Sequence, residues 1–233
     1  MSYNDVAHCS TRSLVCQARS QEIPANKVNP VNEQSTATTP ARTRTPSAMV
    51  EQALVHAAET VLVRDGPAAV TVRAVAAEAG VAPMGIYNRL GGKDGLIDAL
   101  LIRGFDRLRA AVADHGESNP IERLRASAIR YRRFALANPQ YYAVMFTDAI
   151  PHTHDSTQVQ QHAAAAFAEF VAHVEHAITS GAITPGDPLE IAQQLWSAMH
   201  GATALELTGL LVITDPDTSY RTLLDTLLCG LHS

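Results

Sequence analysis

Thr71-Val-Arg-Ala-Val-Ala-Ala-Glu-Ala-Gly-Val-Ala-Pro-Met-Gly-Ile-Tyr-Asn-Arg-Leu-Gly-Gly-Lys-Asp-Gly-Leu96 is the stretch of this sequence that decides the fold. Thr71 is a good N-cap residue for a short helix whose buried face carries Val72 and Val75. Gly80 then falls at the C′ position, where a positive φ is commonly needed. A second short helix follows after a few residues and carries Ile86. Two short helices joined by a tight glycine turn predict a helix-turn-helix that spans about residues 71 to 90.

Helical periodicity extends on both sides of this stretch. Val50, Leu54 and Val61 belong to one apolar stripe, which predicts a helix that begins near residue 47 and ends at Asp65-Gly66-Pro67. After the helix-turn-helix, the spacing of apolar residues and the positions of proline predict helices over 93–114, 120–137, 139–146, 158–180, 188–205 and 219–231. Long alternating runs of Val and Ile are missing from the sequence. The fold class is therefore predicted to be all-α.

Composition divides the chain into three parts. Residues 1–45 are rich in Ser, Thr, Asn, Gln and Pro and show no apolar periodicity, so we expect a disordered N-terminal arm. Residues 46–95 form the expected helix-turn-helix domain, and two basic residues, Arg42 and Arg44, lie at the end of the arm that precedes it. Residues 96–233 form a larger helical domain. This length is sufficient for a hydrophobic core.

Charge is distributed unevenly between these parts. The whole chain has a formal net charge of −5, but residues 42–95 carry +1 and residues 96–233 carry −6. A DNA contact is therefore expected to be local and to use a few basic groups. Three scattered cysteines do not indicate a disulfide framework. We see neither a signal peptide nor an apolar stretch long enough to cross a membrane, and we expect a cytoplasmic protein.

Residues 47 to 100 resemble the DNA-binding domain of the TetR family of bacterial repressors. The resemblance rests on the Thr71-capped helix, its Ala-rich middle, Gly80-Val81, the pair Ile86-Tyr87 and Lys93 at the start of the next helix. It implies hydroxyl contacts from Thr71 and Tyr87 to phosphates, with Lys93 adding charge at a helix N-terminus. The predicted DNA-binding residues are Thr71, Arg73, Pro83, Met84, Gly85, Tyr87, Asn88 and Lys93.

Base recognition is expected to be sparse. Asn88 can offer a paired donor and acceptor to a base. Pro83, Met84 and Gly85 are expected to face the groove but offer few direct hydrogen bonds to base edges. Readout through DNA shape is therefore expected as well.

The C-terminal half carries a second resemblance. Phe134-Ala-Leu-Ala-Asn-Pro-Gln-Tyr-Tyr-Ala-Val-Met-Phe146 and Trp196-Ser-Ala-Met-His-Gly201 resemble the ligand-binding domain of the Trp-His-Gly subgroup of this family. The resemblance implies a small-molecule effector and a homodimer. The predicted effector-binding residues are Tyr131, Phe134, Tyr142, Met145, Phe146, Phe167, Trp196, Met199 and His200. Ordinary core packing remains an alternative for each of them taken singly.

The last two helices are expected to form the dimer. One stripe consists of Leu224, Leu227, Leu228 and Leu231, and another of Ala198, Gly201, Ala202 and Leu205. Two such helices from each subunit would form a four-helix bundle that matches the symmetry of a palindromic operator.

Other functions are weighed against this interpretation. His162, Glu169, His173 and His176 share a helix face, where a solvated surface is favoured over a metal site, and neither a metal nor a cofactor is expected. Motifs for nucleotide, serine-hydrolase or zinc-protease chemistry are missing from the sequence, so no enzyme is expected. A helical enzyme or a protein-binding adaptor without DNA binding remains the alternative to a repressor released by its effector.

Overall fold

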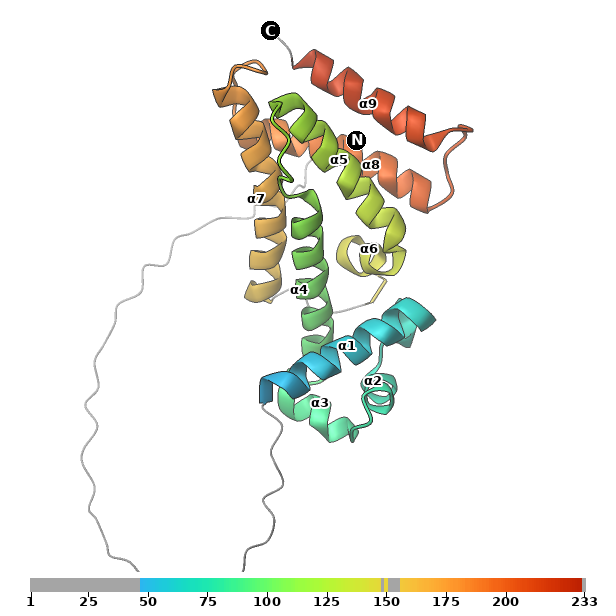
Figure 1. Cartoon of the computed structure of the whole chain (residues 1–233). Coiled ribbons are helices and arrows are strands. Elements are labelled where there is room, and N and C mark those ends of the chain that lie inside the picture. The colour runs from blue at the N-terminus through green and yellow to red at the C-terminus, as the bar shows by residue number, and fades with distance from the viewer. Residues whose placement is uncertain (1–46, 148, 151–155, 232–233) are drawn as a thin grey trace, which may run out of the picture. The chain divides into compact units, whose positions relative to one another are not determined.

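The computed structural model describes residues 47–147, 149–150 and 156–231 (Figure 1). Within this part of the chain every regular element is a helix, which confirms the predicted all-α fold class. The expectations for residues 1–45, including the arm with Arg42 and Arg44, lie outside the described residues. No helix of the described part combines the length and hydropathy that a bilayer crossing demands.

Three helices and the start of a fourth enclose the first core. They are α1 (Ser47–Asp65), α2 (Val72–Glu78), α3 (Pro83–Leu90) and α4 (Lys93–Val112), with a 3-10 turn at Pro67–Ala69. Leu54, Val75, Ile86 and Ile97 are at most 1% exposed and bring one apolar side chain from each helix into this core. Burial of these side chains fixes the orientation of the two short helices, which are too short to be stable alone.

Local caps determine where the helix-turn-helix bends. The Thr71 hydroxyl accepts a hydrogen bond from the backbone N–H of Ala74 at 3.1 Å and so begins α2. Gly80 follows α2 with a φ of +65°, a left-handed conformation that glycine adopts without steric cost. Both predicted signals therefore occur in the structure, and α3 begins at Pro83 directly after the turn.

Five further helices build the larger helical region around the C-terminal half of α4. They are α5 (Pro120–Ala137), α6 (Pro139–Phe146), α7 (Thr157–Thr179), α8 (Pro188–Leu207) and α9 (Pro216–Gly230). In Figure 1, α4 and α7 run side by side, and α5 crosses close to α8 and α9. The predicted bounds of α5 and α6 match the structure. The final helix starts three residues earlier than predicted, because Asp215 caps it and Pro216 occupies its first turn.

The leucine stripe of α9 is buried within its own chain. Leu224 and Leu228 are 2% and 3% exposed and pack in the second core, with Leu227 and Leu231 partly buried against it. Leu224 and Leu228 therefore belong to the core of their own chain and not to the predicted surface between subunits, while the formation of the dimer by the last two helices stays a prediction. On α8, Gly201 and Leu205 are exposed, while Ala198 and Ala202 are half-buried.

The predicted solvated histidine face of α7 also needs correction. His173 is 4% exposed, and its Nε2 hydrogen-bonds the Val112 carbonyl at 2.9 Å across the α4–α7 contact. His176 is exposed, and the half-buried His162 lies 2.6 Å from Asp106. In the described residues, no three or more His, Cys, Asp and Glu side chains are grouped so that they could hold a metal ion.

Candidate DNA interface and ligand cavity

The predicted DNA-reading side chains lie on the surface of the helix-turn-helix. Met84 and Tyr87 are 63% and 54% exposed, although they are large and partly apolar. Ile86, between them in the sequence, is fully buried and anchors α3 to the core. Thr71, Arg73, Pro83, Asn88 and Lys93 are also exposed, and Gly85 is half-buried. The core residue and the surface residues of α3 are thus separated as a groove-reading helix requires.

Two consecutive glycines shape the end of this surface. Gly91 and Gly92 have φ values of +74° and +103° and form the turn between α3 and α4. A Cβ built on Gly92 would lie 3.0 Å from Cε1 of Tyr87, so the tyrosine ring lies against the bare glycine backbone. Lys93 follows as the first residue of α4. The double glycine therefore holds the Tyr87 ring near a helix N-terminus, which is a ready site for a phosphate.

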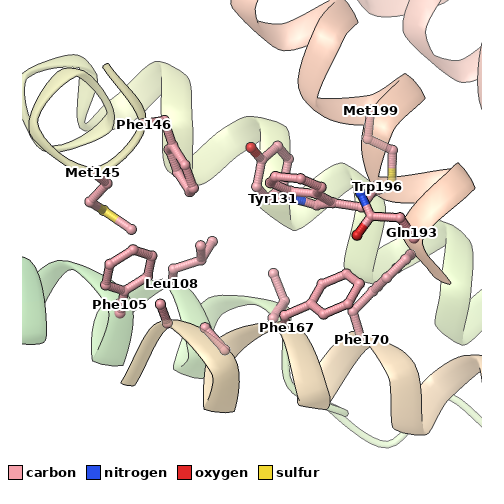
Figure 2. A pocket seen from close by; sticks show the side chains of 13 residues that line it. Phe105, Leu108, Tyr131, Met145, Phe146, Phe167, Phe170, Gln193, Trp196 and Met199 are labelled. Carbon is pink, nitrogen blue, oxygen red and sulfur yellow. The ribbon is translucent and has the colours of Figure 1, made fainter. Parts of the chain in front are cut away.

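An apolar cavity of about 240 Å³ lies in the larger helical region. Figure 2 shows Phe105, Met145 and Phe146 at one end and Phe167, Phe170 and Trp196 at the other. Helices α4, α5, α6, α7 and α8 all contribute to the wall. The lining residues are Phe105, Leu108, Val112, Tyr131, Met145, Phe146, Ala163, Ala166, Phe167, Phe170, Gln193, Trp196 and Met199.

Six of the nine predicted effector-binding residues line this cavity: Tyr131, Met145, Phe146, Phe167, Trp196 and Met199. Phe134, Tyr142 and His200 are not among the lining residues. Phe134 packs in the second core, while Tyr142 and His200 lie behind Tyr131 and Phe146.

Sequence reasoning missed the α4 wall and, apart from Phe167, the α7 wall. Phe105 and Leu108 belong to the apolar spacing that predicts the helix over 93–114, and such spacing alone indicates only a packing face. On α7, Ala163, Ala166, Phe167 and Phe170 recur at spacings of three, one and three, which places them on one helix face. That spacing, with small residues beside the two aromatic rings, was the available signal for the α7 wall.

A polar cluster lies directly behind the cavity wall. The Tyr131 hydroxyl lies 2.7 Å from Nδ1 of His200, and the Tyr142 hydroxyl lies 3.2 Å from the same nitrogen. Burial raises the pKa of both tyrosines and lowers the pKa of His200. All three groups are therefore neutral at neutral pH, and the cluster satisfies its hydrogen bonds without introducing a charge.

A buried carboxylate at the first core joins α1 to α4 and α6. Glu59 of α1 is 5% exposed, and its Oε1 accepts a hydrogen bond from the Tyr141 hydroxyl of α6 at 2.5 Å. The same oxygen lies 2.7 Å from Nε of Arg103 and 2.8 Å from Nη2 of Arg107, both on α4. The Arg107 guanidinium also lies over the Tyr141 ring, 5.2 Å from its centroid. One charged group thus fixes α1 against both α4 and α6.

Comparison with known proteins gives two family matches. A family model described as "Bacterial regulatory proteins, tetR family" matches residues 54–100. A second, described as "Tetracyclin repressor-like, C-terminal domain", matches residues 124–227. Together they span the helix-turn-helix and most of the larger helical region.

Individual relatives agree with these matches. An uncharacterized HTH-type transcriptional regulator of Mycobacterium tuberculosis is 26% identical over 192 residues, which cover 80% of this chain and 84% of the relative. The structure of a protein with unknown function from Rhodococcus sp. RHA1 matches at a TM-score of 0.71 and 30% identity, covering 84% of this chain and all of that one.

A more distant structure shares the fold alone. NalD, the secondary repressor of the MexAB-OprM multidrug efflux pump in Pseudomonas aeruginosa, matches at a TM-score of 0.58 and 19% identity, covering 80% of this chain and 97% of that one. The two family matches and the helix-turn-helix geometry together show that this chain is a DNA-binding transcriptional regulator of the TetR family.

Proposed function

We propose that the protein is a cytoplasmic repressor that binds a palindromic operator as a homodimer and is released by a small-molecule effector. Residues 46–95 would bind DNA, and residues 96–233 would bind the effector and form the dimer. The observation that carries the proposal is the position of α6. Met145 and Phe146 of this helix line the cavity, while Tyr141 of the same helix holds Glu59 of the DNA-binding unit.

The DNA contact is proposed to combine positioning and readout. Thr71, Tyr87 and Lys93 offer hydroxyl and ammonium donors to phosphates, which fix the register of α3 on the duplex. The exposed Asn88 offers the main direct hydrogen bonds to a base edge from α3. Met84 supplies an exposed apolar side chain for a thymine methyl group. This combination favours modest direct readout supplemented by DNA shape.

The dimer is proposed to form around the C-terminal end of α8. Four large apolar side chains are exposed there and in the loop that follows: Leu205, Leu210, Val212 and Ile213, at 47%, 67%, 99% and 42%. Exposed apolar residues gathered in this way are typical of a protein interface. Two-fold pairing of this surface would present two helix-turn-helix units to two half-sites.

Release is proposed to run through α6. A ligand that displaces Met145 or Phe146 shifts the helix that also carries Tyr141, and the buried Glu59 transmits the shift to α1. Because the cores are closely packed, such a helix has a few discrete positions and does not deform continuously. A ligand that prefers one position and DNA that prefers the other are then negatively coupled.

Selection of bound sequences from a random DNA pool tests the DNA-binding part of the proposal. Recovery of an inverted repeat supports a dimeric repressor, and the spacing of its half-sites gives the dimer geometry. Variants Tyr87→Ala and Lys93→Ala are expected to lose affinity for the selected site. Arg133→Ala, which removes an exposed cation of α5, serves as the matched control. If Tyr87→Ala and Lys93→Ala bind as tightly as the control, the proposed docking surface is wrong.

The same selection, combined with a reporter assay, separates the alternative functions. A protein-binding adaptor would recover no enriched DNA sequence at physiological salt. If the protein is an activator, the selection also recovers an operator, but the protein then raises transcription of a reporter gene placed behind that operator. A repressor lowers that transcription, and the effector restores it.

A further inference from the structure

We propose that the cavity takes an uncharged aromatic ligand of roughly ten non-hydrogen atoms, whose terminal hydroxyl meets the side-chain amide of Gln193. The inference rests on the proposed function only in treating this cavity as the effector site. It adds the size, the charge and the orientation of the ligand.

The charge of the ligand follows from the wall. None of the thirteen side chains that line the cavity within the described residues is acidic or basic, and six are aromatic. A carboxylate or ammonium group inside this wall would lose its hydration and find no opposite charge. The Tyr131–His200–Tyr142 cluster behind the wall offers no compensating charge either, because burial favours the neutral form of each group.

The size of the ligand follows from the volume. A dry cavity of about 150 Å³ lined by Leu, Ile and Phe binds benzene, which has six non-hydrogen atoms. At about 240 Å³ this cavity is roughly one and a half times larger, so it accommodates a benzene ring with a short chain. The edge-to-face arrangement of Phe167 and Trp196, with centroids 6.0 Å apart, provides an aromatic environment for that ring.

The orientation of the ligand follows from one polar side chain. Tyr131 lines the cavity, but its hydroxyl is engaged with His200. Gln193 of α8 is exposed at the edge of the lining, and its Nε2 donates to the Ser197 hydroxyl at 3.2 Å. Figure 2 shows its amide beside Trp196. The Gln193 Oε1 is therefore the acceptor for a ligand hydroxyl, with the ring of the ligand deeper in the cavity.

A series of four probes of one shape tests the inference. They are phenylpropanol with a terminal hydroxyl, phenylpropionate, phenylpropylammonium and propylbenzene. The chain contains a single tryptophan, Trp196, which lines the cavity, so tryptophan fluorescence reports occupancy without any DNA. Phenylpropanol is expected to change this fluorescence saturably at pH 7, and the anion and the cation are expected to bind at least about tenfold more weakly. Equal or tighter binding of either ion overturns the proposed ligand class.

Three variants locate the binding. Ala166→Leu fills part of the cavity and is expected to abolish binding, whereas Ala164→Leu, exposed on the same helix, leaves it unchanged. Gln193 is exposed, so Gln193→Leu is not expected to disturb folding. It should remove the preference for phenylpropanol over propylbenzene while propylbenzene still binds. A preference that persists in Gln193→Leu contradicts the assigned orientation.

Operator affinity is then measured with and without saturating phenylpropanol. Binding in the cavity without any change in operator affinity refutes release by this ligand while the assigned ligand class stands. Preferential binding of an ion, accompanied by release of DNA, refutes the ligand class while the proposed function stands. The two failures are therefore distinguishable.

Discussion

Replacing Tyr141 with phenylalanine removes a single oxygen atom from the contact between α6 and α1. The Tyr141 side chain is 1% exposed, and its hydroxyl donates to the buried Glu59 carboxylate. A hydrogen bond to a charged group contributes about 1.5–3 kcal/mol to stability. The two arginines on the same oxygen are 40% and 44% exposed and remain in place, so the carboxylate keeps partners and the loss stays within that range.

Urea unfolding, followed by circular dichroism, measures this loss, and Tyr220→Phe provides the matched control. The Tyr220 hydroxyl is also buried, but it donates to the neutral carbonyl of Ala128 at 3.0 Å. Its loss is expected to cost about 0.5–1.5 kcal/mol. In thermal unfolding, the Tyr141→Phe loss corresponds to a fall in Tm of about 3–12 °C for a domain of this size.

Comparing the stability losses of the two variants tests whether the Tyr141 hydroxyl holds α6 to α1. If Tyr141→Phe costs no more than Tyr220→Phe, then the arginines alone satisfy Glu59 and the hydroxyl is not what holds α6 to α1. The variant is also expected to weaken the effect of the ligand on operator affinity, because it loosens the connection through which the two sites communicate. An unchanged ligand effect in a variant with reduced stability would rule out this route for release.

Further predictions concern the DNA surface, the turn after α3 and the polar cluster behind the cavity. Lys93→Ala is expected to lower the slope of log affinity against log salt by about 0.9, the value for one phosphate contact, in a titration at several salt concentrations; an unchanged slope would show that Lys93 touches no phosphate. Gly95→Ala is expected to unfold at markedly lower temperature, because its Cβ would overlap the Leu90 carbonyl oxygen. A Cβ at Gly85 makes only ordinary contacts, so Gly85→Ala should raise the free energy of unfolding by about 0.5–1 kcal/mol. Similar Tm values for the two variants would contradict the packing at this turn. Burial lowers the pKa of His200 below its ordinary value of about 6.5, so the unfolded chain binds the proton first and stability falls as pH drops below that value. His200→Asn should flatten the fall in stability in that acidic window, and an unchanged pH profile would show that His200 takes no part in it.

Much of the fold could be predicted because this chain marks its helix ends with strong local signals. Asn119 and Pro120 determine the start of α5, Pro139 that of α6 and Thr71 that of α2, since caps and proline act on adjacent residues. The start of α9 could have been predicted in the same way from Asp215-Pro216. Local chemistry was therefore sufficient for the bounds of most helices.

The partner of each helix face could not be predicted in the same way. The leucines of α9 form the stripe that a subunit interface would use, yet Leu224 and Leu228 pack inside their own chain. His173 belonged to a polar face by spacing but is buried against the end of α4. An apolar stripe shows that a face is covered, and only the tertiary arrangement shows what covers it.

For the cavity, too, local sequence patterns indicated some residues, while others depended on the tertiary arrangement. Trp196 stood out as an uncommon residue type within a family resemblance. The α4 residues Phe105 and Leu108 resembled ordinary packing, because a wall and a core use the same side chains. The contact between Glu59 and Tyr141 joins residues 82 positions apart and carried no sequence signal.

The Glu59 contact also determines how such regulators can be recombined. A sensor chimera that joins the helix-turn-helix of this chain to another ligand-binding unit would bring Glu59 without the arginines of α4 or the tyrosine of α6. A buried carboxylate stripped of its partners costs about 3–5 kcal/mol, a large share of the stability of an average domain. A crossover placed after α6 keeps all four residues together, whereas one placed in the loop before α4 separates them. The practical boundary between the modules of this protein is thus set by one carboxylate and not by the limits of its domains.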